Sequence, residues 1–171
     1  MALLPEIRKE VTATALFGAA GLAGFVIAPR DPSAVTATGL FYIALLVNTY
    51  FSIWFFGLLP PKDRDERLID GALVVTYLAL GLSIGRIVLF TSASTALFVI
   101  AIAKYVLLMP IVARRDILRR KIVIDGLGLL LCGMAFAGAL AGYPLESAWL
   151  QAILFGVANV YLLLIRPMYV A

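Results

Sequence analysis

The stretch STALFVIAIAKYVLLMPIVA, residues 94–113, is apolar and long enough to form a membrane-spanning helix, but Lys104 stands near its middle. About 20 mainly apolar residues are needed to cross a bilayer. A lysine at the centre of such a helix costs roughly 2.5–3.5 kcal/mol on insertion scales. The stretch therefore predicts a membrane helix, and it marks Lys104 as a residue that is tied to function.

The composition of the whole chain predicts an integral membrane protein with a single domain, residues 1–171. Its 171 residues are 63% hydrophobic and 14% charged, whereas soluble proteins are about 45–50% apolar and about 25% charged. Histidine is absent and Cys132 is the single cysteine. These counts exclude a disulfide framework and the common cysteine- or histidine-built metal and haem sites. We expect no cofactor and no metal.

Six apolar windows predict an all-α, polytopic fold with six transmembrane helices. Long continuous apolar runs, rather than alternating residues, argue against a membrane β-barrel. The division between the third and fourth windows is the least clear, because LFTSAST (residues 89–95) is only weakly polar. The windows are residues 11–28, 38–59, 69–89, 92–113, 122–142 and 147–165.

The distribution of basic residues predicts that both termini lie in the cytoplasm. In this orientation the outer loops hold Arg30, and Arg86 lies close to the outer face. An excess of Lys and Arg in cytoplasmic segments is the usual rule. We expect a multi-pass protein of a prokaryotic inner membrane or a cell membrane. The basic residues on the cytoplasmic side are Arg8, Lys9, Lys62, Arg64, Arg67, Arg114, Arg115, Arg119, Arg120, Lys121 and Arg166.

Short matches suggest an internal repeat. LIDG at residues 68–71 recurs as VIDG at residues 123–126, and Tyr50 recurs as Tyr105, in each case 55 positions later. Internal repeats are common in transporters, so one interpretation is three tandem helical hairpins of about 55 residues. The alternative is chance similarity in an apolar chain.

Glycine content distinguishes the odd spans from the even ones. Eleven of the 14 glycines lie in the first, third and fifth windows, whereas the even windows carry most aromatic residues. Small residues let membrane helices approach closely. We expect the odd helices to pack tightly together and to offer a surface to a protein partner or a second copy, and the even helices to face lipid, a ligand or a partner. The alternative is that glycine is simply frequent in membrane helices.

The candidate ligand site is centred on Lys104. Counted from the outer end of its window, Lys104 lies near the bilayer midplane, where we expect no carboxylate. A buried ammonium without a counter-ion either loses its proton or receives an anion from a ligand. The structural alternative is that Lys104 snorkels, or bonds to the carbonyl of Val106 that Pro110 frees. Polar residues at similar depth complete the predicted set: Asn48, Tyr50, Tyr105, Asn159 and Tyr161. They could instead connect neighbouring helices.

Other charged residues are expected at the helix ends. Asp70 and Asp125 each precede a predicted span, which is typical of helix N-caps. Arg86 could reach lipid headgroups from the outer face. The segment RRDILRRK, residues 114–121, could bind anionic lipids or a partner protein at the cytoplasmic face, although topology alone also explains it. Its basic residues are Arg114, Arg115, Arg119, Arg120 and Lys121.

Two functions remain open from the sequence. With Ala15, Ala19 and Ala23 on its first helix, the six-span chain resembles the membrane-embedded substrate-binding subunits of energy-coupling-factor vitamin transporters. That resemblance implies an alanine-spaced helix that packs on a coupling subunit. The first hypothesis is a protein that binds or transports a small anionic, polar or amphipathic ligand around Lys104. The alternative is a non-catalytic accessory or scaffold subunit. A membrane enzyme is less favoured because no histidine can act as a base, and we expect no nucleic-acid partner.

Overall fold

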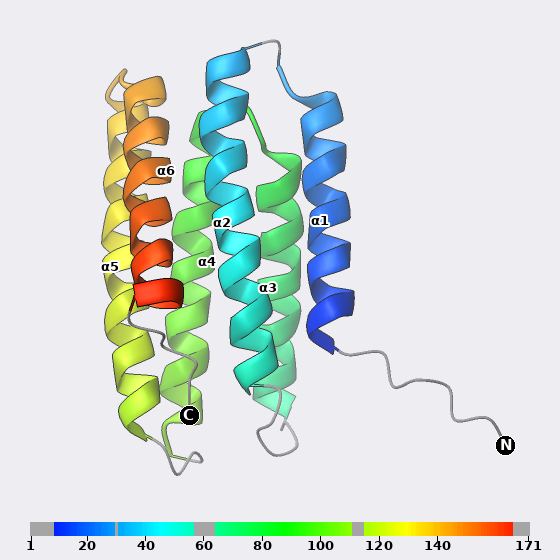
Figure 1. Cartoon of the computed structure of the whole chain (residues 1–171), viewed down its shortest axis with the longest axis vertical. Helices are drawn as coiled ribbons and strands as arrows, with labels where there is room; N and C mark the ends of the chain where they lie inside the picture. Colours follow the sequence, from blue (N-terminus) through cyan, green and yellow to red (C-terminus); the bar gives the residue numbers. More distant parts are fainter. Residues whose placement is uncertain (1–8, 30, 57–63, 111–114, 166–171) are drawn as a thin grey trace, which may run out of the picture.

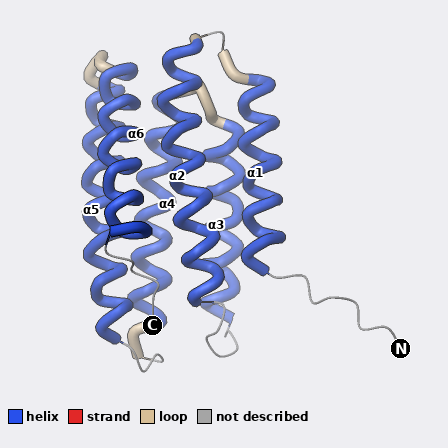
Figure 2. The backbone as a smooth tube through the Cα atoms, in the orientation of Figure 1, coloured by secondary structure: helices blue, strands red, loops and turns tan. Residues whose placement is uncertain are grey.

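The chain folds into a bundle of six α-helices that run alternately in opposite directions (Figure 1). This computed structural model describes residues 9–29, 31–56, 64–110 and 115–165. Figure 2 shows helices and loops but no strand in these residues, so the expected all-α fold is confirmed. The helices are α1 (Lys9–Ile27), α2 (Pro32–Phe56), α3 (Arg64–Leu82), α4 (Ile87–Leu108), α5 (Arg115–Leu140) and α6 (Pro144–Val160), which continues as a π-helical turn at Tyr161–Ile165.

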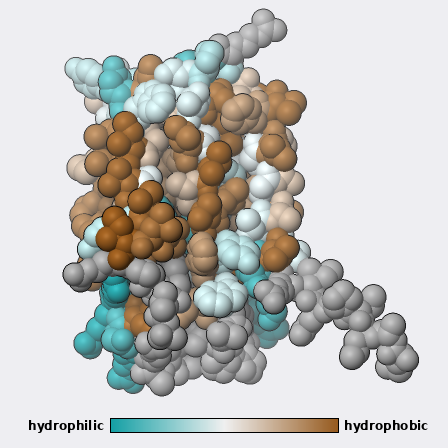
Figure 3. Space-filling view, in the orientation of Figure 1, coloured by the Kyte–Doolittle hydropathy of each residue, from teal (hydrophilic) through white to brown (hydrophobic). Residues whose placement is uncertain are grey.

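Five helices, α1, α2, α4, α5 and α6, are long and apolar enough to cross a membrane by length and composition. Helix α3, which corresponds to the predicted third span, is not among them because five of its first seven residues, from Arg64 to Asp70, are charged. The expectation of six transmembrane helices is thus supported for five. Figure 3 shows apolar side chains over the middle of one face of the bundle and hydrophilic ones toward its lower end. These features are those of a helical membrane protein.

The six helices form a closed ring in the order α1, α2, α6, α5, α4, α3. In Figure 1, α6, α2 and α1 lie in front of α5, α4 and α3. Helices on opposite sides of the ring contact one another little: α4 makes only slight contact with α2 and with α6. This arrangement leaves space inside the ring between α2 and α4.

The ring order contradicts the expected packing of the odd helices. Helix α1 does pack on α3, but α5 packs mainly on α4 and α6. The even helices also supply the aromatic core: the Phe41 ring lies 5.6 Å from that of Phe90 and 4.3 Å from that of Phe155. Large aromatic rings bury much apolar surface, so side chains of the even helices, rather than a close packing of the odd ones, fill this part of the ring.

Glycine nevertheless sets the α1–α3 contact. A Cβ atom added to Gly24 would lie 1.9 Å from the Gly81 carbonyl oxygen. The expectation of close helix contacts through small residues is therefore confirmed for this pair. The spaced alanines Ala15, Ala19 and Ala23 lie on the exposed side of α1.

The helix boundaries follow local chemistry. Asp31 caps α2, because its Oδ1 accepts hydrogen bonds from the Ser33 and Ala34 amides at 3.0 and 3.3 Å, and Pro32 occupies the first helical position. At the same end of the bundle, α5 is followed by Gly142, which has φ +98°. The Tyr143 amide returns to the Gly138 carbonyl at 3.0 Å, as in a Schellman motif.

The expected boundary between the third and fourth spans was misplaced by about five residues. The break lies at residues 83–86, where Gly85 adopts φ +78° and its amide donates to Thr38 Oγ1 at 2.9 Å. Residues 89–95 remain helical because their hydroxyls bond to carbonyls three or four residues earlier, as Thr91 bonds to Ile87 and Thr95 to Thr91. A hydroxyl that is satisfied in this way does not interrupt a helix.

Candidate functional site

A cavity of about 420 Å³ lies inside the ring, and we call it the central cavity. It lies toward the end of the bundle where α1, α3 and α5 begin and α2 and α4 end, below the part of the ring that the aromatic core fills. The described residues of its wall come from five helices, α1 to α5. The polar residues of the wall are Lys9, Asn48, Thr49, Ser52, Glu66, Asp70, Tyr77, Lys104, Tyr105, Lys121 and Asp125.

Lys104 of α4 has a counter-ion. Its Nζ lies 2.6 Å from Asp70 Oδ1 of α3, and the two side chains are 17% and 27% exposed. The expectation that no carboxylate lies at the depth of Lys104 is therefore wrong, and so is the alternative that Lys104 bonds to the Val106 carbonyl. That carbonyl accepts from the Met109 amide at 3.3 Å instead.

The position of Lys104 along its helix was also misjudged. Because α4 begins at Ile87, Lys104 is its eighteenth residue of 22 and lies about one turn from its end. Asp70 belongs to the second turn of α3, which begins at Arg64. Two neighbouring antiparallel helices thus bring Lys104 and Asp70 to the same level near one end of the bundle, rather than to its middle.

A second lysine–aspartate pair lies in the wall of the central cavity. Lys121 Nζ is 2.8 Å from Asp125 Oδ1, one turn apart on α5, and both side chains are 4% exposed. Lys121 was expected at the surface with the other basic residues of its segment, and this expectation is wrong. Asp70 and Asp125 are likewise not N-caps, because each lies within its helix.

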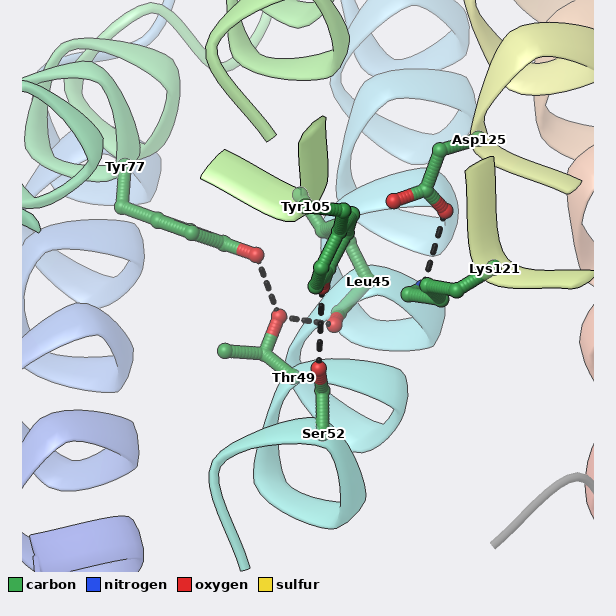
Figure 4. Close-up of polar contacts among 7 residues, drawn as sticks. All are labelled: Leu45, Thr49, Ser52, Tyr77, Tyr105, Lys121 and Asp125. Carbon is green, nitrogen blue, oxygen red and sulfur yellow. Dashed lines mark hydrogen bonds and ion pairs between the residues drawn. The ribbon is translucent and has the colours of Figure 1, made fainter. Parts of the chain in front are cut away.

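Hydroxyl groups connect the helices around the same cavity (Figure 4). Thr49 Oγ1 donates to the Leu45 carbonyl at 2.7 Å, so the Tyr77 hydroxyl, 2.5 Å away, donates to Thr49. Ser52 and Tyr105 also share a hydrogen bond of 3.3 Å. The hydroxyls of Tyr77 and Tyr105 thereby hold α3 and α4 against α2.

A second cavity, of about 640 Å³, opens between α5 and α6, and we call it the α5–α6 groove. It is bordered by Asn48, Phe98 and Asp125, which also line the central cavity, so the two spaces are neighbours. The buried Asn159 faces this region with its Nδ2 bonded to the Phe155 carbonyl at 2.9 Å. Most of the remaining wall is apolar.

The structure separates the six predicted ligand residues. Lys104, Asn48 and Tyr105 line the central cavity, whereas Asn159 and Tyr161 line the α5–α6 groove together with Asn48. Tyr50 lines neither cavity, and its ring packs edge-on against Phe51 at 5.5 Å. Residues two apart on a helix point about 200° apart, which explains why Asn48 and Tyr50 diverge.

The predicted headgroup contacts are mostly exposed. Arg115, Arg119 and Arg120 are exposed on α5, and Arg86 is exposed at the turn before α4. Arg114 lies outside the described residues. Lipid or partner contacts of these arginines remain predictions.

Two signals in the sequence could have identified the acidic residues of the central cavity. Lys121 and Asp125 have the i, i+4 spacing that places two side chains on one helix face. The repeated Asp-Gly at residues 70–71 and 125–126 also marks equivalent carboxylates inside apolar segments. Tyr77, Thr49 and Ser52 gave no comparable signal, because isolated hydroxyls are common in membrane helices.

The described residues contain no group of three or more His, Cys, Asp or Glu side chains that could hold a metal ion. The central cavity instead offers ammonium, carboxylate and hydroxyl groups, which recognise polar ligands through hydrogen bonds and ion pairs. Comparisons of this chain with protein families, with curated proteins and with solved structures found no match.

Proposed function

We propose that this chain is a membrane protein that binds a small zwitterionic amphiphile in the central cavity. The observation that carries the proposal is the presence of two lysine–aspartate pairs in the wall of one cavity that is otherwise largely apolar. Ligand sites in proteins are concave, of about 300–1,000 Å³, and combine apolar walls with a few convergent polar groups. The central cavity, at about 420 Å³, has this character.

The charge balance of the wall favours a ligand without net charge. Among the described residues of the wall, three cations, Lys9, Lys104 and Lys121, are matched by three carboxylates. The carboxylates belong to Glu66, Asp70 and Asp125. A purely anionic ligand would be attracted to a lysine but repelled by the aspartate beside it. A zwitterion satisfies both members of such a pair, which is why we narrow the expected anionic, polar or amphipathic ligand to this class.

The remainder of the wall favours an apolar part in the ligand. Beyond the charged end, the wall consists of aliphatic and aromatic side chains, among them Phe17, Leu73, Leu97 and Phe98. Burial of apolar surface contributes about 25 cal/mol per Å². The ligand therefore places its charged head near Lys104 and Asp70 and its hydrocarbon toward these residues.

The two ion pairs have different roles in this proposal. The Lys104–Asp70 pair is partly exposed, so its two groups can also contact a ligand. The Lys121–Asp125 pair is almost fully buried, and Lys121 also lies 5.7 Å from the centre of the Tyr105 ring. The first pair recognises the charged head, and the second fixes Tyr105 and the shape of the wall.

The proposed site lies on the cytoplasmic side. The basic residues Arg115, Arg119 and Arg120 lie toward the same end of the bundle as the central cavity. The positive-inside rule assigns that end to the cytoplasm. The repeat proposed from the sequence is consistent with the site, since Asp70 and Asp125 are its equivalent positions and both line the central cavity.

Three dodecyl amphiphiles that differ in head charge test the proposal: a carboxybetaine, laurate and dodecyltrimethylammonium. Each is added to the full chain in maltoside micelles while thermal unfolding is followed. The betaine should raise Tm the most, because it carries a charge for each member of the Lys104–Asp70 pair. A ligand at 100 times its Kd stabilises the folded state by about 2.7 kcal/mol. Lys104→Met and Asp70→Asn should each abolish the betaine effect.

A charge exchange separates a binding role from a structural one. Lys104→Asp combined with Asp70→Lys restores an ion pair but reverses its direction, so stability should recover while betaine binding does not. Asp116→Asn, an exposed acid on α5, is the control and should respond like the wild type. Equal shifts with all three amphiphiles, or no shift with any, would contradict the proposal and favour an accessory subunit.

A further inference from the structure

The α5–α6 groove opens to the outside of the ring and shares only Asn48, Phe98 and Asp125 with the central cavity among the described residues. Its α5 side includes Val123 and Leu127, each 63% exposed, and its α6 side includes the exposed Tyr161. Gly128 of α5 and the Phe98 ring of α4 also line the groove. The ring packs directly against Gly128, because glycine has no side chain there. A Cβ atom at Gly128 would lie 2.5 Å from this ring. The groove is thus both open to the outside and apolar inside.

The length of the groove corresponds to one leaflet of a bilayer. On α5 it runs from Arg119 to Leu131, which is about 18 Å at 1.5 Å per residue. The hydrocarbon core of a bilayer is about 30 Å thick, so half of it is about 15 Å. An acyl chain that lies along the groove would extend from the arginine end toward the middle of the membrane.

Two cations stand at one end of this apolar groove. Arg119 and Arg120 are exposed, and the described residues provide no ion-pair partner for either. The carboxylate nearest to them in the wall, Asp125, is bonded to Lys121. The end of the groove is therefore positive, and guanidinium groups bind phosphate oxygens in a bidentate manner.

We propose that the α5–α6 groove binds an anionic phospholipid. One acyl chain lies against Val123, Leu127 and Leu131, and the phosphate is bound by Arg119 and Arg120. Anionic lipids are concentrated at the cytoplasmic face, where the positive-inside rule places these arginines. This site does not depend on ligand binding in the central cavity.

Native mass spectrometry of the full chain in maltoside micelles tests this proposal. The probes are dioleoyl phosphatidylglycerol and dioleoyl phosphatidylcholine, which carry the same chains and differ in head charge. The wild type should retain phosphatidylglycerol at least tenfold better than phosphatidylcholine. Arg119→Gln with Arg120→Gln should remove this preference, whereas Arg115→Gln, an exposed arginine one turn earlier that is not part of the groove, should preserve it.

The acyl chain is tested by filling the groove. Leu127→Trp should weaken retention of both lipids, and Leu130→Trp should not, because Leu130 is equally exposed on α5 but lies outside the groove. Inorganic phosphate should not displace the lipid beyond a chloride control of equal ionic strength. Equal losses with Arg115→Gln, equal losses with Leu130→Trp, or full displacement by phosphate would each overturn the proposal. Unchanged thermal unfolding of the variants shows that they are folded.

Discussion

The Lys121 ammonium lies 2.8 Å from the Asp125 carboxylate, one turn further along α5, and both side chains are 4% exposed. The same ammonium lies 5.7 Å from the centre of the Tyr105 ring on α4. The pair thus connects the two helices that make the most extensive contact in the ring. Loss of either partner would leave a buried charge without compensation, which destabilises the fold strongly.

Removal of one member of this pair should destabilise the fold. Asp125→Asn leaves the Lys121 ammonium without its carboxylate, and loss of one partner from a buried pair costs about 3–5 kcal/mol. Unfolding in mixed micelles with increasing dodecyl sulfate measures the change. The double variant Lys121→Met with Asp125→Leu should recover most of the loss, since an apolar pair of similar volume is often neutral. Asp116→Asn should leave stability unchanged, and a double variant as unstable as Asp125→Asn would contradict this explanation.

The close approach of α1 and α3 should not tolerate a methyl group. Gly24→Ala places a Cβ atom 1.9 Å from the Gly81 carbonyl oxygen, and a backbone atom cannot rotate aside. Overpacking typically costs about 1–3 kcal/mol, so we expect a loss at the upper end of this range in the same unfolding assay. Gly18→Ala, on the same helix with nothing within 4 Å, should be neutral or stabilising by up to about 1 kcal/mol. Equal effects of the two substitutions would show that the contact does not limit stability.

The Tyr42 hydroxyl should contribute to the junction of α1, α2 and α3. It lies 2.8 Å from the Phe17 carbonyl and 3.3 Å from the Tyr77 carbonyl. Hydrogen bonds between membrane helices are worth on average about 0.6 and at most about 1.7 kcal/mol. Tyr42→Phe should therefore lower the free energy of unfolding by an amount within these values. Tyr50→Phe is the matched control and should have no effect, and the interpretation fails if both lose the same amount.

The turn between α3 and α4 should require glycine more strongly than the turn after α5. Gly85 and Gly142 both have positive φ, at +78° and +98°, and a left-handed conformation costs other residues about 1–2 kcal/mol. At Gly85 an added Cβ atom would also meet Val35 Cγ2 at 2.9 Å, whereas at Gly142 nothing lies within 4 Å. Gly85→Ala should thus be more destabilising than Gly142→Ala, as compared by denaturant titration. Equal losses would show that crowding at Gly85 is relieved by a movement of Val35, and the reverse order would contradict the prediction.

The fold class could be predicted from the sequence more completely than the site. Apolar windows identified six helices, because a helix that satisfies its own backbone hydrogen bonds can be recognised locally. The start of α4 was misplaced because the hydroxyls of residues 91–95 satisfy themselves within the helix, while the positive φ of Gly85 was not evident. That shift of about five residues moved Lys104 from the middle of its helix to near its end.

The candidate site could be predicted only in part. Lys104, Asn48 and Tyr105 were selected as unusual residues in apolar surroundings, and all three line the central cavity. Asp70 was assigned to a helix cap, because a carboxylate close to basic residues in sequence resembles one. Its partner Lys104 is 34 positions away, and no local pattern pairs residues at that separation.

The sequence by itself predicted six apolar helices, and the structure has six, of which five are long and apolar enough for a membrane. Hydropathy and helix periodicity are properties of contiguous segments, so they can be read without knowledge of the neighbours. The tertiary structure alone decided the ring order, the central cavity and the pairing of Lys104 with Asp70. Such contacts depend on which helices lie side by side, and in lipid that choice is made by packing and hydrogen bonds between helices rather than by apolar burial.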